Sequence, residues 1–170
     1  MGDPNFNETV AYICKHDDEG ALGIVINRPT TMTVKEIFKQ YALDDAADDQ
    51  ADMPVLSGGP MQPDRGFVLH QSDAEFDSTL DPEASIKVTA SQDILIRMAG
   101  GGGPSPVLVA LGYAGWSAGQ LESELAANAW LSAKADPVIV FDTPYEQRWQ
   151  AAASLIGVDI RQITSYSGHA

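Results

Sequence analysis

The chain of 170 residues carries 24 Asp and Glu against 10 Lys and Arg, which gives a formal net charge of −14 at pH 7. That length suits a single domain spanning 1–170, and the negative charge disfavours direct binding to nucleic acid or to an anionic membrane surface. One cysteine excludes an intrachain disulfide framework and fits a reducing, cytoplasmic compartment, and we expect neither a signal peptide nor a membrane span because no suitable apolar run occurs.

The first part of the chain predicts a hairpin followed by a helix. Residues 9–16 alternate between apolar and polar, and 21–27 form a second apolar run after a polar turn, which together favour a β-hairpin that Pro29 ends. Thr33, with Glu36 three residues later, has the pattern of a capping box. A short amphipathic helix is therefore expected to begin there.

An acidic stretch at about 42–54 contains five Asp and little that a core would bury. This composition predicts a solvated loop. A calcium site is the alternative, but the residue alternation, the glycine and the terminal Glu of an EF-hand loop are missing.

Three β elements are expected next, at 55–56, 67–70 and 85–90, and their succession indicates antiparallel pairing. The alternation within the third element predicts that Lys87 and Thr89 point outward.

The centre of the chain predicts the most buried strand. Ser91 is expected to cap a helix that ends in a glycine run, and the apolar run 107–111 then predicts a central strand covered on both faces. Residues 112–120 follow as a glycine-rich turn, with a helix predicted to begin at Ser117 and to bury Asn128 on its apolar stripe. A helix N-terminus after such a turn can bind an anion through its free N–H groups.

The last part of the chain predicts one more strand and one more helix. The apolar run 138–141 has the pattern of a buried strand, 143–157 that of a helix, and a further short strand is considered at 158–163. This order of elements predicts an α+β fold, with a mixed, mainly antiparallel sheet flanked by about four helices and not a doubly wound parallel sheet.

Several blocks, taken together, carry a resemblance to a known family. They are Asp3-Pro4-Asn5-Phe6, 9–16 with 23–29, Gly58-Gly59-Pro60, 65–70, 112–116 with 119–122, and 168–170. In number, order and spacing they resemble the YqgE/AlgH family of bacterial proteins over nearly the whole chain. The resemblance implies a curved, partly barrel-like sheet, a cytosolic protein, and a role described as transcriptional regulation through the control of alginate in some bacteria.

The same resemblance does not identify any catalytic or binding residues in this chain. The acidic charge argues that any regulation is indirect, through a ligand or a protein partner. Members of the family usually have another apolar strand before the block at 3–6, so we expect an exposed sheet edge here.

The turns around 112–120 predict a site for a small anion. Arg28 and Arg65 stand at strand ends and would clamp a carboxylate or phosphate, unless each pairs with an acidic residue instead. Tyr113 and Trp116 would stack on the ligand, or in the alternative pack in the core. The predicted ligand-binding set is Asn27, Arg28, Pro29, Gly58, Gly59, Arg65, Gly112, Tyr113, Gly115, Trp116 and Ser117.

A small enzyme is the competing hypothesis. Cys14 is a candidate nucleophile or redox-sensing thiol, with His16 or, across strands, His70 as its base. The alternative for Cys14 is a small buried hydrophobe. The histidines share no metal-ligand spacing, so we expect neither a metal nor a cofactor.

Ser117 is a second candidate nucleophile. It shows the G-x-S-x-G pattern of a nucleophile elbow, with Asp142 or Asp159 and then His169 later in the chain, although a capping box explains the same serine. We therefore predict a non-enzymatic, cytosolic regulatory or small-ligand-binding protein. A protein-interaction module that uses an unpaired strand edge, and that forms a homo-oligomer in one version, is the third hypothesis.

Overall fold

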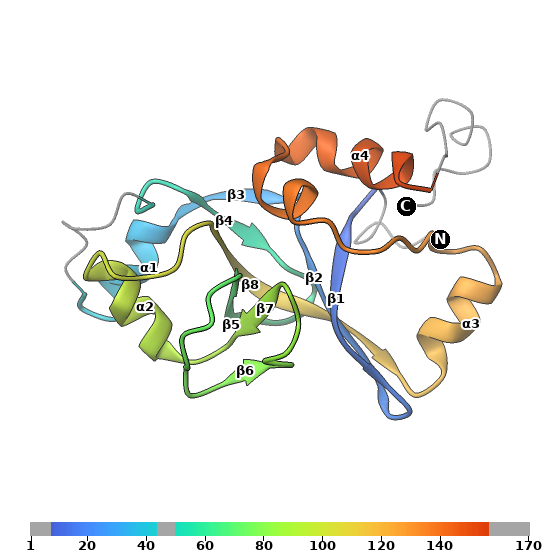
Figure 1. Cartoon of the computed structure of the whole chain (residues 1–170), viewed down its shortest axis with the longest axis horizontal. Helices are drawn as coiled ribbons and strands as arrows, with labels where there is room; N and C mark the ends of the chain where they lie inside the picture. Colours follow the sequence, from blue (N-terminus) through green and yellow to red (C-terminus); the bar gives the residue numbers. More distant parts are fainter. Residues whose placement is uncertain (1–7, 44–49, 157–170) are drawn as a thin grey trace.

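The computed structural model describes residues 8–43 and 50–156 (Figure 1). Within these residues it has the predicted α+β architecture, with a curved, mainly antiparallel, nearly closed sheet and four α-helices. The strands are β1 (Ala11–Asp17), β2 (Gly20–Val25), β3 (Pro29–Thr33), β4 (Pro54–Ser57), β5 (Met61–His70), β6 (Thr79–Leu80), β7 (Lys87–Thr89) and β8 (Val107–Ser117). The helices are α1 (Val34–Gln40), α2 (Gln92–Ala99), α3 (Gln120–Ala126) and α4 (Arg148–Ser154), with a π-helix η1 (Val138–Asp142) and a 3-10 helix η2 (Tyr145–Gln147) before α4.

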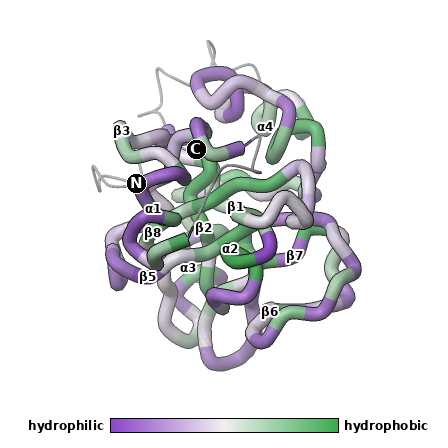
Figure 2. The backbone as a smooth tube through the Cα atoms, turned by 90° about the vertical axis from the view of Figure 1, so that its left-hand side faces the viewer, coloured by the Kyte–Doolittle hydropathy of each residue, from purple (hydrophilic) through white to green (hydrophobic). Residues whose placement is uncertain are grey.

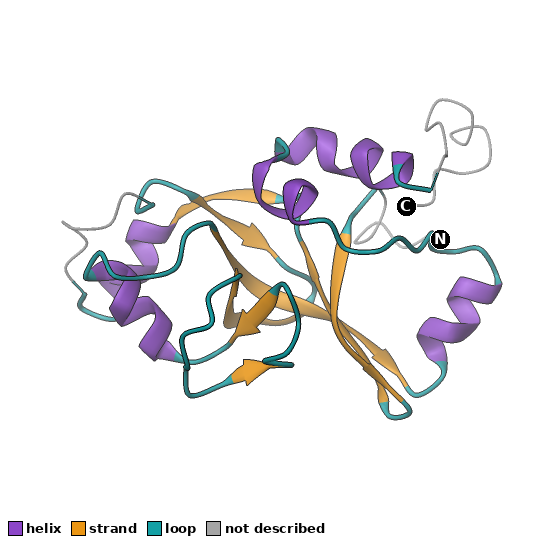
Figure 3. Ribbon diagram, viewed as in Figure 1, coloured by secondary structure: helices purple, strands orange, loops and turns teal. Residues whose placement is uncertain are grey.

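The strands of the described chain run in the order β1-β2-β8-β5-β7-β6, with β4 added to β8 and β3 added to β4. The β4–β8 pair is parallel and the other pairs are antiparallel. Figure 3 shows the strands in the middle, α1 and α2 at one end, α3 at the other, and α4 above the start of the β1–β2 hairpin. None of the described helices has the length and apolar character needed to cross a membrane.

Strand β8 organises the sheet because it pairs with three neighbours. Its first half, up to Leu111, pairs with β5 and β4, and its second half pairs with β2 through Ala114, Gly115 and Trp116. The predicted turn at 112–120 is therefore wrong. The strand continues to Ser117 and α3 begins at Gln120, because pairing with β2 outweighs the local turn preference of the glycines.

The glycines of this region allow three backbone segments to meet, namely β2, β8 and the residues that follow β4. We call Gly58, Gly59 and Gly112 the glycine crossing. Gly58 N donates to Leu111 O at 2.8 Å and Gly58 O accepts from Val25 N at 2.8 Å, which joins β8 to β2. A Cβ on Gly58 would lie 2.3 Å from Gly112 O, and one on Gly112 would lie 2.4 Å from Gly59 O. Only residues without a Cβ permit this approach.

The apolar run that begins β8 is buried on both faces, as predicted. Leu108 and Ala110 belong to one hydrophobic cluster, and Val107 and Val109 belong to a second cluster that α1 and α2 cover. Figure 2 shows hydrophobic stretches along these central strands and hydrophilic stretches in many of the outer loops. The predicted starts of α1 after Thr33 and of α2 after Ser91 are confirmed, although neither side chain forms a capping hydrogen bond.

The prediction that Lys87 and Thr89 point outward is wrong. Their exposed fractions are 8% and 1%, and Ile86 and Val88 are buried as well, so both faces of β7 are covered. The strand also pairs with the short strand β6, which the sequence did not indicate. The Thr89 hydroxyl lies 2.8 Å from Thr79 Oγ1, and Lys87 Nζ lies 3.3 Å from an Asp73 carboxylate oxygen. Polar partners thus permit polar side chains at buried positions.

The apolar run 138–141 forms the π-helix η1 and not the predicted strand. Four apolar residues cannot distinguish a buried strand from a buried helix, and here Val138 is 57% exposed while Ile139 and Val140 are buried. Asp136 starts the turn, since its carboxylate accepts from Val138 N at 2.9 Å and its carbonyl accepts from Ile139 N and Val140 N.

Two further differences come from turn chemistry. Asn128 is exposed, with a φ of 60° just after α3, and is not buried on the helix as predicted. The hairpin does end before Pro29, since β2 stops at Val25, but Pro29 itself begins strand β3, a position that tolerates proline because no N–H is needed. The predicted strand at 158–163 and the candidates Asp159 and His169 lie outside the described residues, as does 44–49 of the acidic loop.

Candidate ligand-binding pocket

The predicted anion-binding residues meet, in part, at the glycine crossing. Arg28 lies beside it, because its carbonyl accepts from Ser57 N at 2.8 Å. Arg65 is exposed and its guanidinium lies 5.2 Å from the centre of the Phe67 ring. Tyr113 packs edge-on against the same ring, with centroids 5.9 Å apart. The glycines pack backbone on backbone, so the crossing has a structural role whether or not it binds a ligand.

The other predicted ligand-binding residues have structural contacts of their own. The Asn27 side chain accepts from Val10 N and donates to Glu8 O, both at 2.9 Å, which fastens the start of β1. Ser117 N donates to Gln120 Oε1 at 2.9 Å, which is one half of the predicted capping box. Pro29 and Gly115 are exposed on β3 and β8.

The candidate catalytic groups bond to different partners. Cys14 occupies a bulge in β1, where its thiol donates to Leu22 O at 3.3 Å, and burial raises the pKa of Cys14 to about 12. His16 Nε2 lies 2.9 Å from a Glu122 carboxylate oxygen. Such a high pKa leaves the thiol protonated at neutral pH, and the nucleophilic form is the thiolate.

His70 is fully buried and lies on β5. Its Nδ1 accepts from Ser72 N at 3.2 Å, so Nε2 carries the proton and donates to Thr89 Oγ1 at 2.8 Å. Burial is the main cause that lowers the pKa of His70. The ring is therefore neutral near pH 7 and acts as a core hydrogen-bonding group.

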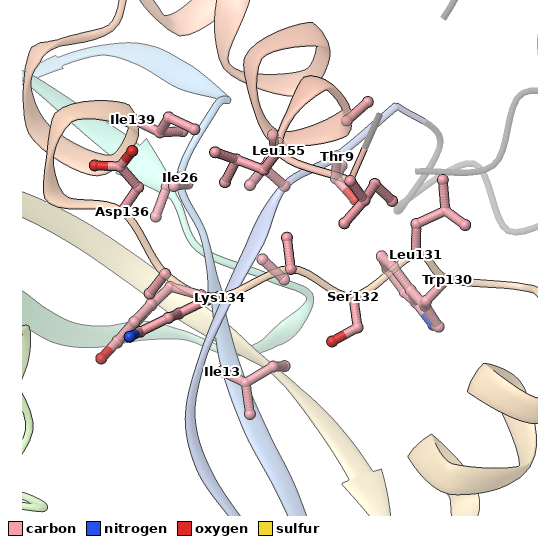
Figure 4. A pocket seen from close by; sticks show the side chains of 18 of the residues that line it. Thr9, Ile13, Ile26, Trp130, Leu131, Ser132, Lys134, Asp136, Ile139 and Leu155 are labelled. Atoms are coloured by element: carbon pink, nitrogen blue, oxygen red, sulfur yellow. The ribbon is translucent and has the colours of Figure 1, made fainter. Parts of the chain in front are cut away.

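A cavity of about 340 Å³ lies elsewhere, between the β1–β2 hairpin, α4 and the segment that leads from α3 to η1 (Figure 4). Its lining is mainly apolar. Trp116 and His16 are the two lining residues that the sequence had singled out. The lining residues used below are Ile13, His16, Trp116, Trp130, Leu131, Lys134, Asp136, Trp149, Ala152, Leu155 and Ile156.

One wall of the pocket is an extended segment, residues 131–135, which we call the strap. Figure 4 shows it crossing over the strands, with Ser132 and Lys134 along it. Trp130 anchors one end and is 8% exposed, and Asp136 anchors the other as the start of η1. Between these anchors the strap residues are exposed and form no hydrogen bond with any part of the chain that the structure describes.

A pair of indole rings forms the end of the pocket near α3. Trp116 and Trp130 pack edge to face, with centroids 5.8 Å apart and planes at 74°. Both indole N–H groups donate to the same oxygen of Glu124, at 3.2 and 2.7 Å. One carboxylate therefore fixes both rings, whose apolar surfaces contribute to the lining.

Helix α4 closes the pocket from above and is fastened to the sheet by a buried arginine. Arg148 is 2% exposed, donates through Nη1 to Ile26 O, and donates through Nε to Thr143 O at 2.8 Å. Its guanidinium also lies 4.4 Å from the centre of the Tyr145 ring. No local pattern predicts this role, which depends on a contact between residues 122 positions apart.

Fold and site together define an α+β protein with a curved sheet and an apolar pocket under a strap. Residues 1–161 match the family model described as AlgH-like. The chain belongs to this AlgH-like family, which confirms the resemblance found in the sequence.

Relatives of similar length support this assignment. The chain is 49% identical over 170 residues to a UPF0301 protein of Xanthomonas campestris pv. campestris and 47% identical to one of Nitrosococcus oceani, covering 100% of this chain and 90% and 91% of the relatives. The solution structure of the AlgH protein from Pseudomonas aeruginosa is similar, with a TM-score of 0.79 at 46% identity, covering 100% of this chain and 90% of that one. A crystal structure from Corynebacterium diphtheriae shares the fold, at a TM-score of 0.66 and 17% identity over 89% of this chain and 78% of that one.

Proposed function

We propose that this protein is a cytosolic small-ligand-binding protein of the AlgH type, which acts in regulation through the occupancy of its pocket. The observation that carries the proposal is the mainly apolar cavity of about 340 Å³ beside a strap without hydrogen bonds to the described chain. This volume lies in the range typical of small-molecule sites. The net charge of −14 supports action through a ligand or a protein partner and not through direct contact with DNA.

The chain offers an intrinsic reporter for this site. It has three tryptophans, and Trp116, Trp130 and Trp149 all line the pocket. A ligand that enters will change their fluorescence, and we expect a titration of small-molecule libraries to give at least one saturable change with a matching rise in the melting temperature. A ligand present at about 100 times its dissociation constant stabilises the fold by roughly 2.7 kcal/mol.

A variant with a filled pocket tests the proposal, and a variant with the same substitution outside the pocket is its matched control. Ala152→Phe on α4 places a ring in the cavity and should abolish the response, while Ala126→Phe on the exposed side of α3 should leave it intact. The proposal fails if no compound gives a saturable signal, or if Ala152→Phe binds as the parent chain does.

The anion site predicted at the glycine crossing remains a separate hypothesis. Arg28→Ala and Arg65→Ala test it with phosphate and organic acids. If stabilisation by a ligand disappears in these variants and persists in Ala152→Phe, the site is the glycine crossing and not the pocket.

The enzyme hypothesis is less well supported, since the Cys14 thiol is protonated at neutral pH and its hydrogen bond goes to a carbonyl. Self-association also remains a prediction, which light scattering over a range of concentrations tests.

A further inference from the structure

We propose that the ligand of this pocket is an amphipathic monocarboxylate, with its apolar body against the tryptophans and its carboxylate bound by Lys134 at the mouth. This inference rests on the proposed function and deepens it by naming the chemical class of the ligand. Three features of the described lining lead to it: the apolar mouth, the single lysine, and the lack of further Lys or Arg residues that would bind a more highly charged ligand.

The mouth of the pocket exposes large apolar side chains. Ile13, Leu131, Leu155 and Ile156 are between 37% and 47% exposed, and all four line the cavity. They come from β1, from the strap and from the end of α4, so the fold gathers them from separate parts of the sequence. Exposed apolar surface gathered at a cavity marks a binding site for an apolar group.

Lys134 is the one lysine or arginine among the lining residues of the described chain. It is exposed and forms no ion pair with any described residue. The nearby Asp136 carboxylate is bonded to the backbone of η1, and His16 is bonded to Glu122. In a chain of net charge −14, an ammonium group that has no acidic partner among the described residues is suited, at an apolar mouth, to the head group of a bound acid.

The same charges exclude a polyanion. Among the described residues the lining offers a single Lys and no Arg, and the net charge of the chain repels an anion more strongly the more charges it carries. A nucleotide would need several donors or cations for its phosphates, whereas a carboxylate needs one. An aliphatic or aromatic body of moderate size fits a cavity of about 340 Å³ lined by indole and aliphatic side chains.

The test compares decanoate with decanol and methyl decanoate by tryptophan fluorescence and calorimetry on the full chain. We expect decanoate to bind about three to ten times more tightly than the two uncharged compounds, because a partly desolvated ion pair adds to the same apolar burial. Lys134→Gln should remove this difference by weakening decanoate alone, and Lys134→Glu should weaken decanoate further.

Lys39→Gln, on α1 and outside the pocket lining, is the matched control and should bind decanoate like the parent chain. The inference is overturned if decanol binds as tightly as decanoate, or if Lys134→Gln leaves decanoate binding unchanged, although either result would still support a ligand pocket. If neither compound binds and the wider libraries give no signal, the proposed function itself fails. If the free protein dimerises and Leu131→Gln abolishes dimerisation, the mouth is an interface between copies and the inference is overturned.

Discussion

The close approach at the glycine crossing makes single residues decisive for stability. Gly112 has a φ of 81°, and a Cβ there would lie 2.4 Å from the carbonyl oxygen of Gly59. Gly112→Ala therefore adds a steric clash to a strained backbone conformation, and we expect it to lower the free energy of unfolding by about 2 to 4 kcal/mol. Urea denaturation followed by circular dichroism measures this change.

Substitutions at two other glycines separate the effect of the steric clash on stability from the effect of the strained backbone conformation. A Cβ on Gly66 would lie 3.8 Å from Leu111 Cδ2, an ordinary contact, and Gly66 has no positive φ, so Gly66→Ala should change stability by less than about 0.5 kcal/mol. Gly119 has a φ of 76° but open space around it, so Gly119→Ala should show the conformational strain alone, at about 1 kcal/mol. Equal effects in all three variants would show that contact at the crossing contributes nothing.

The buried His70 predicts an acid-sensitive fold. Its pKa is lowered in the folded state, so below the ordinary value of 6.5 the unfolded chain takes up a proton that the folded chain does not. Stability is therefore lost as the pH falls below about 6.5, by up to about 1.4 kcal/mol per pH unit from this one group. Unfolding of the parent chain and of His70→Gln between pH 8 and 5 measures the contribution, and parallel curves would contradict it.

At the scale of the elements, the strap is the least secured part of the pocket. Residues 131–135 are exposed and form no hydrogen bond with the described chain, whereas β8 is bonded on both sides. We expect hydrogen exchange of the strap amides to be fast in the free protein and to slow at least tenfold when a ligand occupies the pocket. An unchanged exchange rate of the strap amides in a saturated complex would contradict the prediction.

Most elements could be predicted from local patterns, because those patterns agree with the fold. The β1–β2 hairpin, the starts of α1 and α2, and the buried run of β8 follow from alternation, capping residues and hydrophobicity. The second half of β8 could not be predicted, since pairing with β2, which is distant in the sequence, extends it. The π-helix η1 could not be predicted because four apolar residues fit a buried strand and a buried helix equally well.

The candidate site was harder to predict than the fold. Its lining comes from β1, β8, α3, the strap and α4, and no motif connects them in the sequence. Trp116 was recognised as a residue that could stack on a ligand, but its partners Trp130 and Glu124 become visible only when α3 is folded back onto β8. The net charge, in contrast, depends on composition alone and needed no structure.

At the scale of the whole molecule, β8 contributes to each of the three hydrophobic clusters formed by the described residues. Leu108, Val109 and Trp116 belong to three different hydrophobic clusters, yet they lie on one strand. Neither end of the protein can lose its packing without releasing the strand on which the other end depends. We expect a single cooperative melting transition, with equal van't Hoff and calorimetric enthalpies, and two resolved transitions would contradict this.

This shared strand has a consequence for the effect of a ligand. A compound held beside Trp116 touches only the far end of β8, but the stabilisation it provides would reach α1 and α2 at the opposite end, because they melt together with that strand. Occupancy of the pocket would then slow the global unfolding of faces that the compound never contacts, while local openings that leave the pocket intact would keep their rates.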